Sequence, residues 1–154
     1  MNDIGGQYVV FSINGILYGI PILEVSEIIR RQPLMTTMQA EDEFLGILSL
    51  RRKIVPVLSL HRLFREPEPA HGAKTERIMI IAHEGREIGI VVDEVSRVLH
   101  LSGQPISTPP YMARNKWING LYQHGELLIT LLRTSPLFDA ERAGFAEMDD
   151  SCAG

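Results

Sequence analysis

The 154-residue sequence has little cysteine, few aromatic residues and no excess of positive charge. Its single cysteine, Cys152, can form neither an internal disulfide nor a thiolate metal site. Hydrophobic runs fall short of the roughly 20 residues that a membrane-spanning helix needs, so we expect a cytoplasmic protein without direct membrane insertion. A net charge of −4 and an aromatic content of 6% argue against a nucleic-acid-binding protein. The best basic cluster is short, Arg51-Arg52-Lys53.

Sequence signatures of common enzyme sites are also missing. The chain contains no GxxxxGK[ST] phosphate-binding loop, no GxSxG nucleophile turn and no HExxH zinc motif. Its five histidines have no metal-ligand spacing. We interpret His71 and His124 as solvated surface residues, and His83 as either exposed or a cap. Asp93 and Glu94 follow a hydrophobic run, and we interpret them as residues that cap or bend the chain there. We therefore expect no enzyme activity, no catalytic residue, no metal and no cofactor.

The most informative feature is an internal repeat. Residues 7–29 and 77–99 align without a gap at an offset of 70, with six identities that include two glycine positions. This pattern favours a duplication over a chance similarity of two hairpins. It predicts two similar β units, about 7–60 and 77–133, either separate or interleaved. The Pro- and charge-rich linker 65–76 between them is expected to lie outside the core.

Short β-branched runs separated by turn signals predict an all-β protein built from small barrels. The expected strands are 8–13, 78–82, 45–50, 54–60, 117–122 and 127–132. Asn14-Gly15 and Glu84-Gly85 are expected hairpin turns, because a type I′ turn needs positive φ at both central residues. Gly19 and Gly89 lie inside returning strands and predict bulges or bends.

The segment after Pro21 predicts a short helix, because Ile22, Val25 and Ile29 share one helical face. The equivalent segment 91–101 is more β-branched, and we expect strand over much of it. The C-terminal residues 143–154 are polar and predict a disordered tail.

Four segments then identify a family resemblance. YGIPILEVSEII, GILSLRRKIVPVLSL, IGIVVDEVSRVL and INGLYQHGELLITLL resemble, in order, the signature regions of the CheW family of chemotaxis adaptors. Each segment is weak alone, but four in the right order and spacing are specific. The resemblance covers about residues 7–140 and implies a CheW-like domain over residues 5–142.

The resemblance implies two packed Src homology 3-like five-stranded β-barrels with short helices. It implies a non-enzymatic adaptor that couples methyl-accepting chemoreceptors to a sensor histidine kinase. The implied partners are the chemoreceptor cytoplasmic tip and the kinase regulatory domain, with no nucleic acid. The adaptor is expected to be a monomer, or to self-associate weakly within receptor arrays.

The resemblance also implies a partner-binding site. Its residues are carried over by position onto six residues of this chain: Arg51, Glu27, Val25, Gly46, Gly89 and Gly120. Taken without the family, Arg51 is a solvated hairpin residue, Glu27 a charge on an exposed helix face and Val25 a core residue. The glycines equally suit a role in backbone geometry at barrel edges.

The sequence departs from the family pattern at several positions. The family turn reads Asn-Leu-Arg-Gly, whereas this chain has Ser49-Leu50-Arg51-Arg52. If that glycine has positive φ, Arg52 costs about 1 kcal/mol or changes the turn. Ser59 and Leu132 stand at usually acidic positions, and Pro136 is expected to interrupt a terminal helix. These changes are as compatible with type IV pilus motility or surface sensing as with flagellar chemotaxis.

Two other classes of function remain open from the sequence. One is a small β-barrel module that binds a small ligand or an oligonucleotide, which the few aromatic residues disfavour. The other is a structural homo-oligomer that pairs exposed strand edges.

Overall fold

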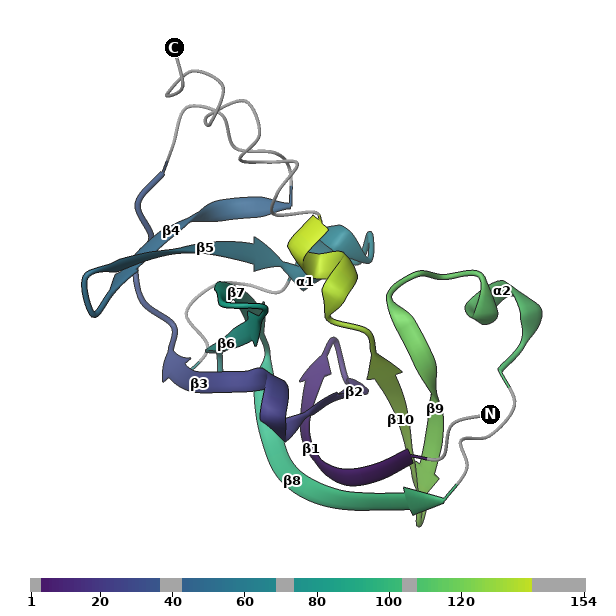
Figure 1. The fold of residues 1–154 in the computed structure, drawn as a ribbon. Coiled ribbons are helices and arrows are strands. Elements are labelled where there is room, and N and C mark those ends of the chain that lie inside the picture. Colours follow the sequence, from purple (N-terminus) through teal and green to yellow (C-terminus); the bar gives the residue numbers. More distant parts are fainter. Residues whose placement is uncertain (1–3, 37–42, 69–73, 104–107, 140–154) are drawn as a thin grey trace.

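A computed structural model describes residues 4–36, 43–68, 74–103 and 108–139, and these residues are mostly β-strand (Figure 1). The described strands are β1 (Ile4–Ile13), β2 (Ile16–Pro21), β3 (Val25–Arg30), β4 (Phe44–Leu50), β5 (Lys53–Ser59), β6 (Arg77–His83), β7 (Arg86–Val92), β8 (Glu94–Gly103), β9 (Ile118–His124) and β10 (Leu127–Leu132). The helices are short: η1 (Ile22–Glu24), α1 (Leu60–Leu63), α2 (Pro110–Ala113) and a turn over 135–139. The tail 143–154 and linker residues 69–73 lie outside the described residues.

The strands form two five-stranded sheets, and each sheet takes strands from both halves of the chain. Sheet A has the order β8-β1-β2-β10-β9, and sheet B has the order β3-β6-β7-β5-β4. The opening hairpin of each sequence repeat thus sits in one sheet, while its third strand sits in the other. Neither 7–60 nor 77–133 builds a sheet by itself.

The strand register follows the sequence repeat. Tyr8 of β1 faces Leu99 of β8, and the positions 70 residues away give the matching pair of Ile78 in β6 and Ile29 in β3. Both pairings also contain one register shift. The parallel pairings also correspond, since Gly19 of β2 faces Leu131 of β10 and the equivalent Gly89 of β7 faces Val57 of β5. The repeat is therefore structural as well as sequential.

Contacts between the outer strands curl each sheet toward a barrel. In sheet B, Met35 follows β3 and exchanges two backbone hydrogen bonds with Ile47 of β4, at 2.7 and 2.8 Å. In sheet A, the Tyr122 hydroxyl of β9 donates to the Ser102 carbonyl of β8 at 2.6 Å and accepts from its N–H at 3.2 Å. The all-β prediction with two five-stranded barrels and short helices is confirmed.

Three hydrophobic clusters make up the core. Each sheet encloses a small cluster of its own, around Val10 and Leu131 in sheet A and around Val57 and Ile80 in sheet B. The largest cluster takes side chains from both sheets and from the helical turn 135–139; its members include Phe11, Ile13, Ile20, Phe44, Leu58, Ile81, Ile88, Leu132 and Phe138. Alternate residues of β1 and β6 thus point into different clusters, which explains why these strands are continuously hydrophobic in sequence.

The predicted hairpin turns are confirmed by their backbone angles. Asn14-Gly15 has φ of 50° and 81°, and Glu84-Gly85 has φ of 50° and 78°. The β4–β5 turn has the same form, with φ of 50° at Arg51 and 66° at Arg52. Two arginines therefore occupy a conformation in which each side chain is unfavourable by comparison with glycine.

The predicted helix over residues 22–29 is wrong for most of its length. Only Ile22–Glu24 is helical, as η1, and Val25 and Glu27 lie on strand β3 instead. The burial of β3 alternates residue by residue, because the strand pairs with β6 at one edge of sheet B. The spacing of Ile22, Val25 and Ile29 satisfies a helical face by coincidence, and the β-branched content of the segment was the better signal.

Two further expectations need correction. Gly19 and Gly89 do not mark bulges in their hairpins, since the β1–β2 and β6–β7 registers run unbroken through them. A Cβ at Gly19 would lie 3.1 Å from Leu131 Cδ2, and one at Gly89 would lie 2.9 Å from Ile78 Cγ2, so a larger residue at either position must displace a packed side chain. Pro136 does not interrupt the last helical turn, because it lies in the first turn of 135–139, where proline is tolerated.

Replacing Arg52 with glycine is expected to raise the free energy of unfolding by about 0.5–1 kcal/mol, because glycine adopts positive φ at lower cost. Urea denaturation measures the effect. Lys53→Gly is the matched control, since Lys53 lies in strand β5 and the same change there is expected to destabilise. An Arg52→Gly variant that is equally or less stable than the parent would contradict this account of the turn.

Candidate functional site

The two charged residues that the sequence singled out meet at one end of sheet B. Arg51 lies in the β4–β5 turn and Glu27 lies in β3, at the opposite edge of the sheet. The Arg51 guanidinium is 2.7 Å from Glu27 Oε1. The Arg51 side chain is 72% exposed and that of Glu27 is 24% exposed. The pair therefore connects the two edges of the sheet at a surface that solvent and partners can reach.

Polar contacts continue from this ion pair along the same end of the sheet. The Ser26 hydroxyl donates to Glu87 Oε2 at 2.9 Å, and Lys53 Nζ lies 3.9 Å from Glu87 Oε1. We call these five residues, Ser26, Glu27, Arg51, Lys53 and Glu87, the sheet B rim. An open groove of about 530 Å³ adjoins the rim between β5 and the β6–β7 turn. Ile54 lines it and is 65% exposed, so the groove offers an apolar anchor beside charged groups.

The other four predicted site residues lie mostly away from the surface. Val25 is half-buried and packs against the core cluster that both sheets share. Gly46, Gly89 and Gly120 are buried in β4, β7 and β9. The structure thus brings Arg51 and Glu27 together, and it places the three glycines where they serve the backbone.

Gly46 shows the reason for a glycine most clearly. A Cβ at this position would lie 2.5 Å from the Met35 carbonyl oxygen, which belongs to the segment that bridges β3 to β4. The backbone φ of 152° at Gly46 is also one that other residues rarely adopt. The close approach of residues 34–36 to β4 therefore depends on glycine here.

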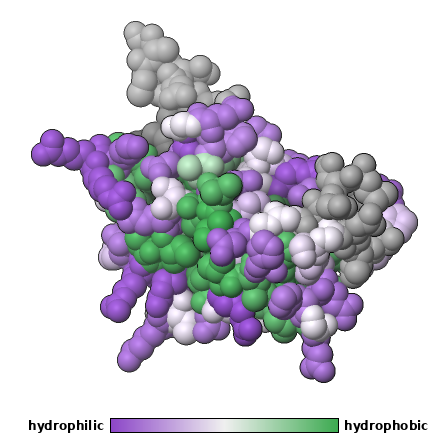
Figure 2. All heavy atoms as spheres, turned by 60° about the horizontal axis from the view of Figure 1, so that its bottom comes forward, coloured by the Kyte–Doolittle hydropathy of each residue, from purple (hydrophilic) through white to green (hydrophobic). Residues whose placement is uncertain are grey.

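Exposed hydrophobic side chains lie on the side of the molecule that carries β3 and β8. Figure 2 views the molecule from the bottom of Figure 1, where β3 and β8 lie, and shows hydrophobic side chains gathered on that face. Exposed hydrophobic residues on these elements are Leu23 of η1, Ile28 of β3 and Val98 of β8, with exposed fractions of 96%, 39% and 47%. We call Leu23, Ile28 and Val98 the apolar face. Exposed hydrophobic groups that gather on one face typically mark a contact surface for another protein.

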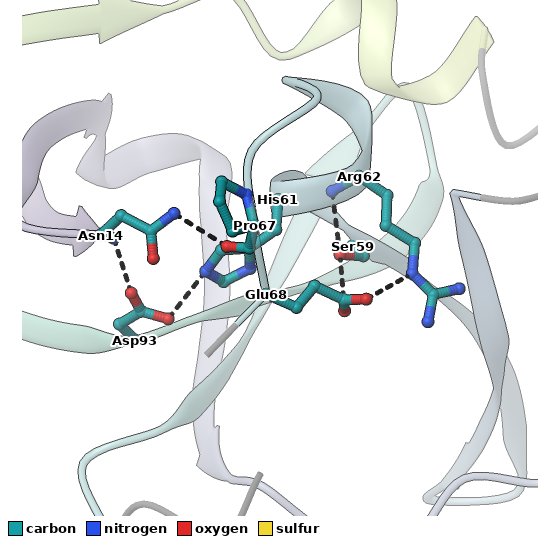
Figure 3. A network of polar contacts seen from close by, with 7 residues as sticks. All are labelled: Asn14, Ser59, His61, Arg62, Pro67, Glu68 and Asp93. Carbon is teal, nitrogen blue, oxygen red and sulfur yellow. Dashed lines mark hydrogen bonds and ion pairs between the residues drawn. The ribbon is translucent and has the colours of Figure 1, made fainter. Parts of the chain in front are cut away.

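A buried histidine and a carboxylate form the one arrangement that resembles catalytic chemistry among the described residues (Figure 3). His61 Nε2 lies 2.9 Å from Asp93 Oδ1, although the contact falls outside hydrogen-bond geometry. Asp93 Oδ2 accepts a 2.6 Å hydrogen bond from the Asn14 backbone N–H, and the Asn14 side chain donates to the Pro67 carbonyl at 2.9 Å. The His61 side chain is only 3% exposed, so a substrate has no access to its ring. The arrangement ties the β1–β2 turn and the linker to the bend at Asp93.

The burial of His61 was not foreseen from the sequence, which made no specific prediction for this residue. His61 follows the buried strand β5 and sits in the first turn of α1, which packs against the core. Its neighbour Leu60 is fully buried, and this hydrophobic context was the available sequence signal. The prediction that Asp93 bends the chain is confirmed, because Asp93 forms the bend between β7 and β8.

Ser59 and the linker form a second polar cluster beside the first (Figure 3). The buried Ser59 hydroxyl caps α1 by accepting from the Arg62 backbone N–H at 3.2 Å. Glu68 Oε1 accepts from Arg62 Nε at 2.8 Å, and this hydrogen bond lowers the pKa of the Glu68 carboxyl. Residues 65–68 are thus held against the fold by polar contacts, while they remain exposed and outside the core as expected. Leu132, the other departure from the acidic pattern, is buried in the shared core.

Two findings bound the chemistry of the described part of the chain. None of its His, Cys, Asp and Glu side chains gather in threes in a way that could hold a metal ion. None of its helices has the length and hydrophobicity needed to cross a membrane.

Comparison with known proteins shows one consistent similarity. Residues 7–142 match the family model described as CheW-like domain. "Chemotaxis protein CheW" of Treponema pallidum is 29% identical over 147 residues, covering 92% of this chain and 86% of the relative. The protein of the same name from Klebsiella aerogenes is 29% identical over 148 residues, covering 94% and 88%. The crystal structure of the scaffolding protein TtCheW from Thermoanaerobacter tengcongensis superimposes with a TM-score of 0.77 at 27% identity, covering 88% of each chain.

Gly46→Ala is expected to lower the free energy of unfolding by about 1–3 kcal/mol, because the new methyl group collides with the Met35 carbonyl. Thermal and urea denaturation measure the loss. Gly5→Ala is the control, since a Cβ at Gly5 meets no atom within 4 Å. Equal stability of the two variants would show that the approach of residues 34–36 to β4 does not need glycine.

Proposed function

The chain belongs to the CheW-like domain family, a family of chemotaxis scaffold proteins, and we propose that it is a non-enzymatic signalling adaptor. It couples methyl-accepting chemoreceptors to a sensor histidine kinase through protein–protein contacts. The adaptor unit is residues 5–142. The pathway is chemotaxis or a related motility or surface-sensing system. The protein works in the cytoplasm at membrane-associated receptor clusters.

The observation that carries this proposal is the exposed ion pair at the sheet B rim. An ion pair with this much solvent exposure contributes only about 0.2–1 kcal/mol to folding stability. Its charged groups are therefore available for partner recognition at small cost to the fold. By resemblance to the family, Arg51 and Glu27 stand at positions of receptor and partner contact. We assign them, with the neighbouring rim residues, to partner binding.

The apolar face supports binding of the helical receptor tip. Leu23 of η1 is almost completely exposed, and the exposed Ile28 directly follows Glu27 along β3. An amphipathic helix binds such a surface by packing its hydrophobic stripe on exposed side chains, while its polar flank meets nearby charges. The rim supplies those charges. We therefore propose that the receptor tip lies on the apolar face and reaches the sheet B rim.

Val25, Gly46, Gly89 and Gly120 act indirectly in this proposal. Val25 anchors the start of β3 to the shared core, and the buried glycines allow close packing of the strands that carry the rim. They set the shape of the contact surface without touching a partner.

The second partner is the regulatory domain of the kinase, which has the same fold in this family. We propose that it contacts an edge of the other barrel. Each contact is of the transient kind that buries about 1,200 Å² or less. Arrays strengthen such contacts by multivalency, so weak self-association of a monomer is sufficient. A shift of the receptor on one barrel then changes the geometry of the kinase on the other.

Arg51→Glu is expected to abolish retention of the receptor and to leave the melting temperature within a few degrees of the parent, because it places two like charges at an exposed site. The measurement is co-purification from lysate of the source organism, with identification of the retained proteins and a thermal melt of each variant. The parent is expected to retain a histidine kinase and a chemoreceptor.

Arg133→Glu is the matched control, an exposed arginine at the end of β10 in sheet A, and it is expected to retain both partners. Normal retention of the receptor by Arg51→Glu would remove Arg51 from the site. Retention of neither protein by the well-folded parent would contradict the adaptor function itself.

A further inference from the structure

A small aromatic pocket lies apart from the sheet B rim and the apolar face. It encloses about 200 Å³, between the end of α1 and the segment that leads into β9. Its walls include the rings of Tyr18, Phe64 and Trp117, together with the side chains of Glu66 and Asn115. Figure 1 shows α1 and the start of β9 near one another in the middle of the view.

The three rings form a continuous aromatic surface. The ring centroid of Phe64 lies 5.5 Å from that of Tyr18 and 6.5 Å from that of Trp117. Aromatic faces carry partial negative charge and attract cations, with tryptophan the strongest. The chain shows this attraction itself, because Lys116 Nζ lies 4.8 Å from the Trp117 centroid. A cation can therefore reach at least one face of this indole.

Glu66 adds a full negative charge to the same pocket. Its backbone N–H donates to the His61 carbonyl at 2.7 Å, which fixes the chain, while its carboxylate has no partner in the part of the chain that the structure describes. Burial and then the negative charge of Glu66 raise the pKa of the Tyr18 hydroxyl. Glu66 thus places its charge in the lining of the pocket close to Tyr18, and the pocket is electrostatically suited to a cation.

The volume restricts what the cation can be. Pockets for drug-sized ligands and cofactors measure about 300–1,000 Å³, so a pocket of about 200 Å³ suits a single long side chain. Guanidinium is planar, stacks on aromatic faces and pairs with both oxygens of a carboxylate, whereas ammonium is more strongly hydrated. We propose that this pocket binds one arginine side chain of a partner protein. Its guanidinium packs on the aromatic surface of Phe64 and Trp117 on one side and pairs with the carboxylate of Glu66 on the other.

The test uses Trp117, which is the single tryptophan of the chain, so its fluorescence and its indole N–H signal in NMR report on the pocket directly. The full chain is titrated with N-acetylarginine amide at constant ionic strength. The neutral isostere N-acetylcitrulline amide and N-acetyllysine amide are the comparison probes. The arginine probe is expected to bind saturably with a dissociation constant on the order of millimolar, and at least about fivefold more tightly than either comparison probe.

Two variants locate the binding. Glu66→Gln is expected to weaken binding of the arginine probe by at least about fivefold, whereas Glu126→Gln, an exposed carboxylate in the β9–β10 turn, leaves it unchanged. Lys116→Met is expected to strengthen it, because the variant removes a competing positive charge beside Trp117. Both positions are exposed, so the variants are expected to fold.

Several results would overturn the proposal. They are equal binding of the citrulline probe, tighter binding of the lysine probe, no saturable response of Trp117, or unchanged affinity in Glu66→Gln. None of these results bears on Arg51 or on the adaptor function, because the pocket shares no residue with the sheet B rim or the apolar face.

Discussion

The hydrophobic cluster between the two sheets is the constraint on which the rest of the structure depends. It joins Phe11 and Ile20 of sheet A with Leu58 and Ile88 of sheet B, and Phe138 of the last described helical turn. Strands β1 and β6 are buried on both faces, so neither sheet can exist in water without the other. The two repeats also contribute to both sheets, because β3 of the first repeat lies in sheet B and β8 of the second lies in sheet A. Each sheet therefore needs strands from both repeats. The described chain is therefore one folding unit, although its sequence carries an internal repeat.

This rigid unit explains how small surface features can serve as binding sites. The sheet B rim depends on Arg51 in a tight turn and on Glu27 in an edge strand, and both elements are anchored by the core beneath them. The hydrogen bonds that link Asn14 to Asp93 and Pro67 fix the β1–β2 turn and the start of the linker on the fold. Contact residues held by such a framework lose little conformational entropy on binding. Weak contacts can then be specific.

The sequence predicted the parts of the fold that depend on local chemistry. Asn14-Gly15 needs positive φ wherever it occurs, and the runs beginning at Tyr8 and Ile78 favour strands in any setting. Features that depend on pairing between distant segments could not be predicted from the sequence. Residues 25–30 form a strand because β6 lies beside them, and the exchange of strands between the two repeats has no local signal. For the same reason the burial of His61 and the aromatic pocket at Trp117 were not predicted: each depends on residues from separate parts of the chain.

In the function proposed above, one molecule holds two different partners at once, on different barrels. The most direct measurement is analytical ultracentrifugation of the purified chain with the kinase regulatory domain and a soluble receptor-tip fragment, first in pairs and then together. The account predicts a ternary complex that contains all three proteins, and loss of the receptor fragment alone when Arg51 is changed to glutamate. Mutually exclusive binding of the two partners would contradict it, because the chain would then not connect receptor to kinase.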